Sequence, residues 1–500
     1  MNFARDVVDA ADPDRPALLE LARDGSRRTW SFGEISAASV RLLAHLQAAG
    51  VRRGDIVMTL VGNRPEWVIT MVACFRAGFV VLPCNEQLRA EDLRARLALA
   101  QPRAIVVDER NLTELTAAGP DPACAIVTVP DAALFTAAPA GGGEPTVAPT
   151  ATGPWPELDP RDPCLITFTS GTTGSAKGVV HGQRYLTGQA LQAEHWLAPA
   201  VGQLVWCTAA SGWSKSARNV FIAPWLRGAA ALLHDARFDP AERLEILARE
   251  RVQVLCMAPT EYRVMAKRLD LGPLPALRGM VAAGEALNAE VLRAWREAVG
   301  LDIRDGYGQT ETGQLTANPP GAPARPGSMG RALPGISLVV DNGELVLADP
   351  RSDPTFFVGY LGGEPAPEDR PWRTGDRVRV DEQGYLYFEG RSDDVIISAG
   401  YRIGPFEVES ALVSHPAVAE AAAIAVPDEE RGAVVCAVVV PREGVSGSDA
   451  LARELQEWVK ARTAPYKYPR MVRFVAELPK TSSGKVQRAR LREGISSNRE

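Results

Sequence analysis

The sequence predicts an α/β protein: a large N-terminal region of doubly wound sheets plus a small antiparallel β unit, followed by a small α+β C-terminal domain. Three observations predict this fold. From Ile56 to about Ala282, short β-branched runs alternate with helical patterns, which is typical of a parallel sheet covered by helices. After about Pro334, Asp, Asn and Gly turns separate short alternating strands. From Pro405 onward, helices and strands mix again in a compact α+β pattern.

The N-terminal elements follow from apolar runs bounded by turn residues. Asn63, Pro65 and Glu66 signal a helix between the first two strands. Residues 137–162 are rich in Pro, Gly, Ala and Thr, so we expect a surface excursion there rather than a core element. The strands expected in this region are 56–61, 79–82, 104–107, 164–169, 204–207, 229–233, 254–257 and 279–282.

The elements after residue 334 are shorter. The last ~110 residues look separate from the rest, which predicts a boundary between a domain of residues 1–390 and a domain of residues 391–500. The antiparallel unit is expected to contain strands at 337–340, 344–347, 377–380 and 385–389. Beyond it we expect a helix at 405–414, strands at 419–426 and 434–440, a helix at 448–463 and a charged basic tail.

Composition excludes several function classes. The chain has 500 residues, of which 46% are apolar and 23% are charged, as in ordinary folded proteins. Its net charge of -6 includes no long run of either sign, so we expect no nucleic-acid partner and no polybasic membrane patch. No run reaches the ~18 apolar residues of a membrane span, since the best candidate, 67–83, is cut by Arg76.

Cysteine usage and the N-terminal residues indicate a compartment. The 7 cysteines are scattered and contain no CxxC pair, which is typical of free thiols in a reducing environment. The first residues carry acids and prolines where a signal peptide needs an apolar stretch. We therefore expect a cytoplasmic protein.

A loop rich in glycine and hydroxyl groups follows the strand at 164–169. The segment 168–178, FTSGTTGSAKG, offers backbone N–H groups, hydroxyls and a cation to a phosphate. It is not a Walker A loop, because its glycine spacing differs and Gly178 stands where Ser or Thr would be. A flexible surface loop is the alternative. The candidate residues are Thr169, Ser170, Gly171, Thr172, Thr173, Gly174 and Lys177.

A second cluster, 305–313, reads DGYGQTETG and combines a ring, a hydroxyl and a carboxylate. These groups suit a purine, a phosphate and Mg²⁺ bound through oxygen. A glycine turn with a surface Glu is the alternative. The segment 283–286 ends another strand, and its exposed backbone could lie along the edge of an adenine, because ligands of open α/β sheets bind at the carboxyl ends of strands. The candidate residues are Gly284, Glu285, Ala286, Asp305, Gly306, Tyr307, Gly308, Gln309, Thr310 and Glu311.

Further charged residues flank the antiparallel unit and end the chain. Asp376, in the segment WRTGD, suits a ribose diol, and Arg391 suits a phosphate or ribose oxygen. Asp376 alone is more often a turn residue. The tail 479–488, PKTSSGKVQR, places Lys485 after a hydroxyl-rich turn, which suits delivery of a mobile positive charge. A solvated basic tail is the alternative.

Taken together and in this order, these segments resemble the acyl-activating family of AMP-forming synthetases, which includes acyl-CoA synthetases, adenylation domains of peptide synthetases and beetle luciferases. The resemblance covers nearly the whole chain. The segments 398–405 (SAGYRIGP), 464–470 (APYKYPR) and 479–488 are most similar to the medium-chain and aryl acyl-CoA synthetases. Ala176 departs from the family's loop, which usually has proline there, and should soften the loop slightly.

The resemblance implies that ATP activates a carboxylic acid to an acyl adenylate and that coenzyme A then captures the acyl group. ATP, Mg²⁺ and CoA are the implied cofactor and co-substrates, and no side-chain nucleophile is required. Lys485, Thr310 and Glu311 would be catalytic, with Lys485 bridging the carboxylate and the α-phosphate and Glu311 holding Mg²⁺. The segment 169–177 would hold the pyrophosphate end. Asp305 to Thr310 with Gly284 to Ala286 would hold the adenine and α-phosphate, and Asp376 and Arg391 the ribose.

The resemblance also implies a mobile C-terminal domain that swings about a hinge at Asp393 between the two steps. The rotated domain would present Gly400, Tyr401 and Arg402 to the pantetheine channel. Arg431 would contact a CoA phosphate.

The acyl pocket is expected at Trp213, Ala282 and Ala283, where the resemblance places a pocket wall beside small residues. Such a cavity has room for a ring or a medium aliphatic chain, so we expect acetate to be a poor substrate. The alternative is that Trp213 is simply a core aromatic.

Two other functions remain to be weighed. The enzyme could pass the acyl group to a carrier-protein thiol or use the adenylate in an oxidation, although the segment 466–470 resembles the CoA-using branch. A nucleotide-binding protein without catalysis would be expected to lack Lys485 or Glu311, and both are present. The sequence does not predict the oligomeric state.

Overall fold

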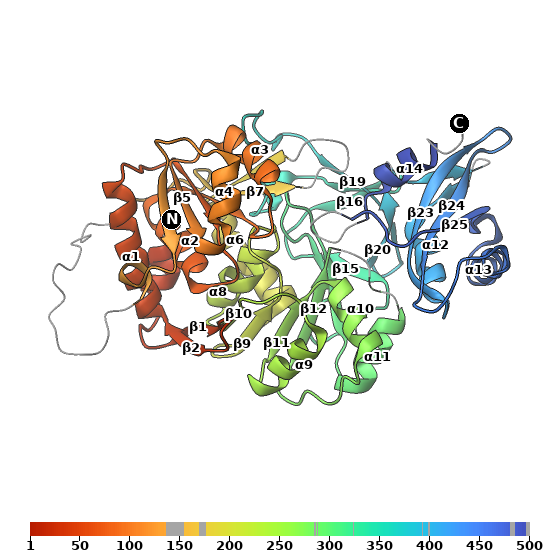
Figure 1. The fold of residues 1–500 in the computed structure, drawn as a ribbon, viewed down its shortest axis with the longest axis horizontal. Coiled ribbons are helices and arrows are strands. Elements are labelled where there is room, and N and C mark those ends of the chain that lie inside the picture. Colours follow the sequence, from red (N-terminus) through yellow and green to blue (C-terminus); the bar gives the residue numbers. More distant parts are fainter. Residues whose placement is uncertain are drawn as a thin grey trace.

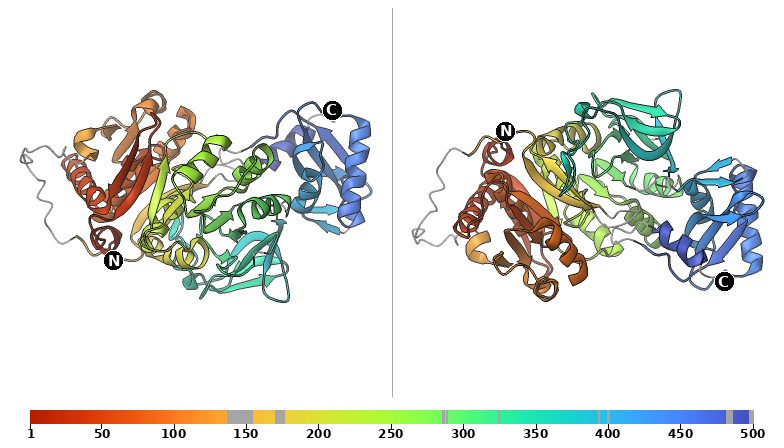
Figure 2. Two further views of the ribbon diagram at one scale, coloured as in Figure 1. Left: turned by 90° about the horizontal axis from the view of Figure 1, so that it is seen from below. Right: turned by 90° about the horizontal axis from the view of Figure 1, so that it is seen from above.

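The computed structural model describes residues 1–136, 155–169, 177–284, 287, 289–323, 325–392, 394–398, 401–480 and 486–496, without the side chains of residues 402, 495 and 496. The N-terminal elements lie at one end of the molecule and the C-terminal elements at the other (Figure 1), and two further views agree (Figure 2). Helices and strands alternate through most of the chain. The predicted α/β class is confirmed.

The first sheet contains seven strands of the described chain. Neighbouring strands are parallel from β6 through β7, whereas β8 and β18 add to the edge antiparallel. Strands β4 and β5 are buried along their whole length, which explains why β4 and residues 104–107 of β5 are apolar; the buried Asp108 at the end of β5 pairs with Arg64 and Arg110. The order across the sheet is β18 (Gly359–Tyr360), β8 (Lys177–Gly182), β7 (Pro163–Thr169), β4 (Val80–Cys84), β3 (Ile56–Leu60), β5 (Ala104–Asp108) and β6 (Ala125–Val129).

The second sheet contains thirteen described strands and changes character along its width. Strands β1, β10, β9, β11, β12 and β13 are parallel neighbours, and from β13 onward every pairing is antiparallel. Its order is β16 (Leu338–Asp341), β17 (Glu344–Leu347), β19 (Trp372–Val380), β20 (Leu386–Arg391), β15 (Ser328–Ala332), β14 (Thr316–Ala317), β13 (Ile303–Tyr307), β12 (Gly279–Ala283), β11 (Val254–Met257), β9 (Leu204–Cys207), β10 (Ala230–His234), β1 (Pro16–Leu21) and β2 (Arg27–Ser31).

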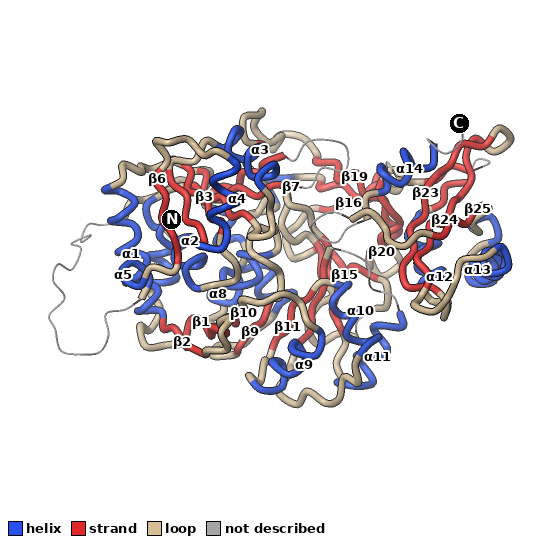
Figure 3. Tube along the Cα trace, viewed as in Figure 1, coloured by secondary structure: helices blue, strands red, loops and turns tan. Residues whose placement is uncertain are grey.

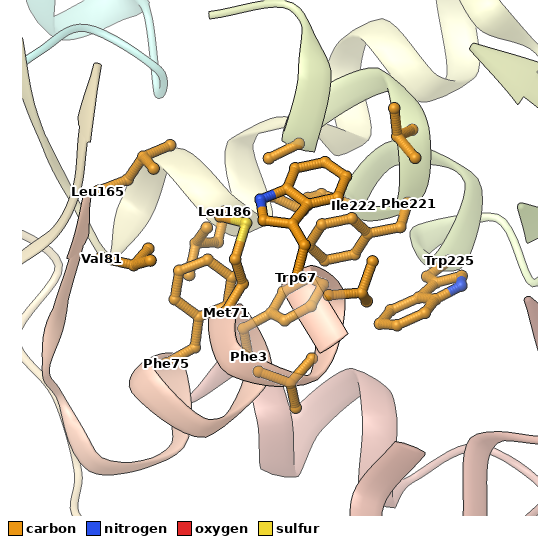
Figure 4. Close-up of a cluster of buried hydrophobic side chains, with 14 of the residues drawn as sticks. Phe3, Trp67, Met71, Phe75, Val81, Leu165, Leu186, Phe221, Ile222 and Trp225 are labelled. Atoms are coloured by element: carbon orange, nitrogen blue, oxygen red, sulfur yellow. The ribbon is translucent and has the colours of Figure 1, made fainter. Parts of the chain in front are cut away.

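The helices of the N-terminal region include one that is buried on all sides. Every residue of α2 (Pro65–Ala77) is buried, and Trp67, Met71 and Phe75 pack with Phe221 and Trp225 in the core cluster of Figure 4. The other helices are α1 (Phe32–Ala48), α3 (Ala90–Ala100), α4 (Leu112–Ala118), α5 (Ala132–Phe135), α6 (Arg184–Gly188), α7 (Ala190–Gln192), α8 (Ala223–Leu226), α9 (Pro240–Arg249), α10 (Pro259–Arg268) and α11 (Ala289–Val299), with short π or 3₁₀ turns η1 (Ala4–Asp9), η2 (Glu109–Asn111), η3 (Ala193–Leu197), η4 (Arg218–Ile222) and η5 (Pro350–Ser352).

Arg76, which interrupts the most apolar run of the sequence, is buried in this core. Its guanidinium pairs with the Asp9 carboxylate at 2.5 Å and also donates to Ser36 and Ser39. The carboxylate compensates the buried charge, which would otherwise be costly to desolvate. Among the described helices, none is long and apolar enough to cross a membrane.

The C-terminal elements form a small separate body at one end of the molecule (Figure 3). Strands β23 (Val418–Asp428) and β24 (Gly432–Pro441) pair antiparallel, and β25 (Met471–Phe474) joins β24 in parallel. A two-stranded ribbon of β21 (Ile396–Ser398) and β22 (Tyr401–Ile403) precedes them. The helices of this part are α12 (Pro405–Val413), α13 (Asp449–Arg462) and α14 (Arg488–Ser496), with the 3₁₀ turn η6 (Pro465–Lys467).

Most predicted elements match, although β6, β8, β14, β15 and β18 were not among the expected strands, and four further differences stand out. The strand expected at 377–380 begins at Trp372, so Asp376 lies within β19 rather than in a turn. The antiparallel unit continues the hydrogen bonding of the parallel sheet instead of forming a sheet of its own. The expected basic tail contains a helix, α14, and β25 was not anticipated. The predictions also omitted β1, β2 and α1, whose strands carry Pro16 and several charged residues. Of the expected surface excursion, residues 137–154 lie outside the described part, and 155–162 contain neither helix nor strand.

Candidate active site

The candidate site begins at the carboxyl ends of two parallel neighbours, β12 and β13. Ala282 lies opposite Asp305 and Ala283 lies opposite Gly306, so the two sequence clusters meet at one edge of the sheet. The chain turns sharply after β13. The turn brings the backbone of Gly313 so close to Gly308 that a Cβ atom on Gly308 would lie 1.7 Å from the Gly313 oxygen. Only glycine fits there. The turn therefore presents residues 309–312 at the sheet edge.

A hydrogen-bonded network joins this turn to the antiparallel strands. The Tyr307 hydroxyl donates to Asp376 Oδ2 at 2.5 Å, and Gln309 Nε2 donates to the same oxygen at 2.9 Å. Arg391 Nη1 lies 3.3 Å from Asp376 Oδ1 and donates to the Thr374 carbonyl at 3.0 Å. Four of the predicted nucleotide-binding residues are thus brought together from three strands and a turn.

Two carboxyl groups of the site are deeply buried. Burial raises the pKa of Asp376, while the hydrogen bond from Tyr307 and the charge of Arg391 oppose that rise. Burial raises the pKa of Asp305 to about 8, against a hydrogen bond from the Gly306 N–H and the charge of Lys215. Buried carboxyls of this kind occur at functional sites more often than elsewhere. The Asp376 carboxylate is held in place by Tyr307 and Gln309 at one oxygen and by Arg391 at the other.

Glu311 and Lys177 are linked through a tyrosine that sequence reasoning missed. The Tyr360 hydroxyl donates to Glu311 Oε1 at 3.0 Å, and Lys177 Nζ lies 5.3 Å from the centre of the Tyr360 ring. Tyr360 is on β18, which pairs with β8, and β8 begins at Lys177. No local pattern around Tyr360 signals this contact, since it depends on the pairing of two strands far apart in the chain.

The turn that carries Glu311 is supported from behind. The Thr355 hydroxyl donates to the Thr312 carbonyl at 2.6 Å, and the Phe357 N–H donates to the Glu311 carbonyl at 2.8 Å. Asp353 accepts from the Thr355 N–H at 2.8 Å. Thr310 lies in the same turn and is half-buried. These bonds fix the backbone of the turn while leaving its side chains at the sheet edge.

Several predicted residues lie outside the described part of the chain. Thr169 pairs with Lys177 across β7 and β8, which closes the loop that contains the rest of the first motif. The residues outside the description are Ser170, Gly171, Thr172, Thr173, Gly174, Glu285, Ala286, Asp393, Gly400 and Lys485, together with the side chain of Arg402.

The predicted CoA-binding residues that are described lie on the C-terminal body. Tyr401 is 52% exposed, and its ring stacks on Tyr466 with centroids 4.4 Å apart and planes 17° apart. Arg431 lies in the turn between β23 and β24, where its N–H donates to Asp428 Oδ1 at 2.9 Å. The structure does not bring Arg431 together with the network around Asp376.

The described residues on either side of segment 481–485 are fixed by contacts within the C-terminal body. Lys480 and Val486 pair antiparallel on its two sides. Arg488 pairs with Glu409 at 2.8 Å and with Asp394 at 3.4 Å. The start of α14 is therefore held beside the residue that follows the predicted hinge.

Trp213 lies in the loop after β9 and is half-buried, so it is not one of the fully buried core aromatics. Two residues later, Lys215 donates to the Ala283 carbonyl at 2.7 Å. Sequence reasoning missed this lysine, because nothing in the local pattern shows that it reaches β12.

Comparisons with known proteins show which family the chain belongs to. The family model described as AMP-binding enzyme matches residues 5–351, and the model of the AMP-binding enzyme C-terminal domain matches residues 407–485. The chain belongs to the AMP-binding enzyme family. It is 37% identical to an uncharacterized acyl-CoA ligase, YtcI, of Bacillus subtilis, over 97% of this chain and 94% of that protein. It is also 37% identical to human mitochondrial acyl-coenzyme A synthetase ACSM4, over 98% of this chain and 90% of that protein.

Solved structures of AMP-binding enzymes share the fold. An anthranilate CoA ligase, AuaEII, in complex with anthranoyl-AMP superposes with a TM-score of 0.85 at 28% identity, covering 100% of this chain and 98% of the other. A benzoate CoA ligase from Burkholderia xenovorans gives 0.82 at 27% identity, covering 98% and 100%. An acyl-CoA synthetase of Brucella canis gives 0.71 at 31% identity, covering 100% and 95%. This AMP-binding enzyme is an AMP-forming acyl-CoA synthetase, which uses ATP, Mg²⁺ and CoA.

The described side chains fit a Mg²⁺ ion that is shared with nucleotide phosphates. Among the described residues, no group of three or more His, Cys, Asp or Glu side chains could hold a metal alone. Glu311 supplies one carboxylate at the sheet edge, and Tyr360 orients it. Mg²⁺ is commonly bound by one or two carboxylates together with substrate phosphates, so a single Glu is adequate for this AMP-binding enzyme.

Proposed function

We propose that this acyl-CoA synthetase activates a medium-chain or aryl carboxylic acid at the edge formed by β12, β13 and the turn after Tyr307. In the first step a carboxylate oxygen bonds to the α-phosphorus of ATP and pyrophosphate leaves. In the second step the CoA sulfur bonds to the acyl carbon, its proton is lost, and AMP leaves. The observation that carries this proposal is the network in which Tyr307, Gln309 and Arg391 converge on Asp376.

The proposed residue roles follow from charge and geometry. Asp376 accepts hydrogen bonds from the ribose hydroxyls, and Arg391 neutralises its charge and reaches the nucleotide. The segment 169–177 holds the pyrophosphate end through backbone N–H groups and Lys177. Lys485 supplies a cation at the α-phosphate, where negative charge builds up in the transition state. Glu311 holds Mg²⁺, which neutralises phosphate charge when it is bound.

The adenine lies, in this proposal, between Tyr307 and the backbone after β12. Thr310 holds the α-phosphate through its hydroxyl. Gly284 has a backbone φ of +100°, which residues with a side chain rarely adopt. Because glycine has no Cβ atom, the nucleotide can approach the backbone closely there. The residues assigned to the nucleotide are therefore those that follow two neighbouring strands.

We propose domains of residues 1–390 and 391–500 with a hinge at Asp393. The residues before position 393 contact the large domain, and the residue after it contacts the small domain. Arg391 and Ser392 fall within 391–500 but precede the hinge, and both contact the large domain: Arg391 pairs with Asp376, and the Ser392 N–H donates to the Gly375 carbonyl at 2.7 Å. Asp394, in contrast, pairs with Arg488 of the small domain. A rotation between 392 and 394 would therefore break neither set of contacts.

After that rotation, the ribbon of β21 and β22 would reach the large domain. Gly400, Tyr401 and Arg402 would then line the pantetheine channel, and Arg431 would contact a CoA phosphate. Support comes from the exposure of Tyr401, because the ring stacks on Tyr466 and is still half exposed to a partner surface.

The size of the acyl group is argued from the pocket wall. Trp213 is half-buried, and Ala282 and Ala283 are small residues at the end of β12, whose backbone the Trp213 loop reaches through Lys215. The aryl alternative is also supported by the benzoate and anthranilate CoA ligases that share the fold. Since each buried CH₂ contributes ~0.8 kcal/mol, lengthening the acid from two carbons to six should raise kcat/KM by about two orders of magnitude.

A pyrophosphate-release assay over acetate, butyrate, hexanoate, octanoate and benzoate, followed by detection of the CoA thioester, tests the proposal. We expect an optimum at a medium chain or at benzoate. An optimum at acetate or at sixteen carbons would contradict the pocket assignment. Adenylate without thioester would favour a carrier-protein acceptor or an oxidation, and ATP binding without pyrophosphate release would favour a non-catalytic protein. Asp376→Asn serves as the control for a damaged nucleotide site.

We also propose that the enzyme works in the cytoplasm. All seven cysteines lie in described segments, and each is a free, buried thiol. Free thiols are typical of reducing compartments. Fractionation of the source cells with an antibody against the chain tests this location.

A further inference from the structure

Two cysteines lie opposite each other on neighbouring strands of the second sheet. Cys207 is the last residue of β9, and its register partner on the parallel strand β11 is Cys256 (Figure 1). Both side chains belong to the same core cluster, so they project from the same face of the sheet. Neighbouring strands lie ~4.8 Å apart, which is within the ~4.4–6.8 Å between the Cα atoms of a disulfide. The backbone spacing therefore permits a bond between the two sulfur atoms.

The other five cysteines, all in described segments of the chain, have no cysteine opposite them. Cys84 of β4 is paired with Leu60 of β3. Cys436 of β24 is paired with Ile424 and Met471. No cysteine is a register partner of the remaining three, Cys74 in α2, Cys124 before β6 and Cys164 in β7. Among the seven cysteines, the strand pairing thus selects Cys207 and Cys256.

The surroundings of Cys207 favour its thiolate. A hydrogen bond from the Cys256 thiol lowers the pKa of Cys207, although burial opposes this shift. The Ala209 N–H and the charge of Lys215 lower that pKa further. The bond to Cys207, together with burial, raises the pKa of Cys256. Peroxides oxidise the thiolate form of cysteine. Burial instead raises the pKa of the thiols of Cys74, Cys84 and Cys164.

The loop of residues 208–217 connects this thiol pair to the proposed acyl pocket. The loop begins beside the second thiol, because the Thr208 N–H donates to the Cys256 carbonyl at 3.0 Å. It then carries Trp213, the proposed pocket wall, and Lys215, which bonds to the end of β12. A change at the ends of β9 and β11 is therefore transmitted to the residues that line the pocket.

This loop has little freedom to absorb such a change. The Ser211 N–H donates to Asn63 Oδ1 at 2.8 Å, which ties the loop to the first sheet. A Cβ atom on Gly212 would lie 2.3 Å from the Asn85 nitrogen, so the loop packs directly on the end of β4. A bond between the two sulfur atoms would draw the ends of β9 and β11 together and move the start of the loop against these anchors. Displacing substrate-positioning residues by ~1 Å can lower activity by ~10²-fold.

We infer that Cys207 and Cys256 are a redox-sensitive thiol pair: a peroxide converts them to a disulfide that stops acyl activation, and a thiol reductant restores it. This inference concerns the regulation of the proposed acyl site and rests on the proposed function. Disulfides of reducing compartments are usually transient and redox-sensing, which agrees with the proposed location. The two residues are 2% and 5% exposed, so we expect only a small oxidant to reach them.

The reaction proceeds in two steps. The Cys207 sulfur attacks one peroxide oxygen, the O–O bond breaks, and the hydroxide that leaves takes a proton to form water. The Cys256 sulfur then attacks the resulting sulfenic sulfur, the S–S bond forms, the S–O bond breaks, and the hydroxide leaves with the Cys256 proton as a second water. The peroxide gains the two electrons that the thiol pair loses.

The test treats the purified, reduced enzyme with hydrogen peroxide and follows two readouts. Intact mass and peptide mapping detect the loss of two hydrogens and identify the cysteines that are joined. Pyrophosphate release with the best acid of the panel gives the activity before oxidation, after it and after dithiothreitol. Cys207→Ala and Cys256→Ala each remove one partner, and Cys436→Ala, which removes a buried cysteine of β24, is the matched control. Thermal unfolding of each variant checks that it folds.

We expect peroxide to join Cys207 to Cys256 within one chain and to lower the wild-type rate by at least ~10-fold. Dithiothreitol should restore the rate, and Cys436→Ala should behave like the wild type. Cys207→Ala should form no disulfide and keep most of its own untreated activity. Cys256→Ala should form no disulfide either, but should carry a sulfenic acid at Cys207 that dimedone labels.

The absence of a disulfide, or one that joins other cysteines or two chains, would overturn the inference. A joined pair with unchanged activity would overturn it as well, and so would equal inhibition of the wild type and Cys207→Ala. If a variant fails to fold, the mapping and the reversal in the wild type still decide. Failure of the reduced wild type to release pyrophosphate with any acid would instead contradict the proposed function, while the mapping would still test the thiol pair.

Discussion

The Nη1 atom of Arg488 lies 3.4 Å from the Oδ2 atom of Asp394, a residue 94 positions earlier in the chain. Asp394 follows the proposed hinge residue, and Arg488 follows the turn that contains Lys485. Arg488 also pairs with Glu409 on α12. The start of α14, three residues after Lys485 in the chain, is therefore fastened to the first residues of the small domain. Rotation about the hinge would carry both together.

Asp393→Pro should leave ATP–pyrophosphate exchange measurable but stop CoA acylation. Proline holds φ near -65° and so prevents the backbone change that the rotation requires. Only the second step needs the swing. ATP–pyrophosphate exchange and thioester formation are measured separately on one preparation. Asp394→Pro is not a suitable second variant, because it would also remove the carboxylate that pairs with Arg488. Acylation at a near wild-type rate would place the hinge elsewhere.

Lys485→Ala should abolish adenylate formation while largely sparing thioester formation from added acyl adenylate. Loss of one preorganised charge at the α-phosphate should cost at least ~10²-fold in the first step. Lys480→Ala, which removes the cation on the other side of the same turn, is the control and should lose much less. Equal losses in the two half-reactions would show that Lys485 does not act in the first step alone.

Tyr360→Phe should raise the Mg²⁺ concentration needed for half-maximal pyrophosphate release. The variant keeps the ring beside Lys177 but removes the hydroxyl that donates to Glu311. A hydrogen bond to a charged group is worth roughly 1.5 kcal/mol or more, which corresponds to about tenfold. Titration with Mg²⁺ at fixed ATP gives the shift. Tyr385→Phe, just before β20 and in contact with Arg325 and Arg331, should show none. An unchanged Mg²⁺ dependence would separate Tyr360 from the metal site.

His181 should make the protein less stable in acid. Burial, with the nearby Arg218 charge, lowers the pKa of His181 to about 3, although the Thr355 and Thr310 carbonyls oppose the shift and Arg184 adds to it. An unfolded histidine titrates near pH 6.5. Between roughly pH 6.5 and 3 the unfolded chain therefore binds more protons than the folded one, and stability falls as the pH falls, by up to ~1.4 kcal/mol per pH unit.

His181→Phe should remove that share of the acid dependence while keeping the ring contact with Tyr185, whose centroid lies 4.0 Å away. Urea unfolding at several pH values between 4 and 7 measures the slope. His45→Phe, on the exposed face of α1, is the matched control. The same slope in wild type and His181→Phe would assign the acid sensitivity to other groups.

Local sequence was sufficient for the strands that shape the site. The apolar runs at 104–107 and 254–257 became β5 and β11 nearly residue for residue, because a strand buried on both faces must be apolar throughout. The strands β1 and β2 were missed because Pro16, Glu20 and the arginines of β2 interrupt the apolar pattern. Their places in the sheet depend on the pairing of β1 with β10 and of β2 with β1. The same holds for β25, a short strand that joins β24 in parallel.

The sequence by itself determined which segments carry the chemistry: the loop of 168–178, the turn of 305–313 and the tail of 479–488, each recognisable from neighbouring residues alone. Only the tertiary structure decided which side chains meet. Tyr307 and Asp376 are 69 residues apart, and Lys215 and Ala283 are 68 apart. Such contacts depend on strand order and loop packing across whole sheets, which local periodicity does not encode, so Tyr360 and Lys215 became visible only once the strands were paired.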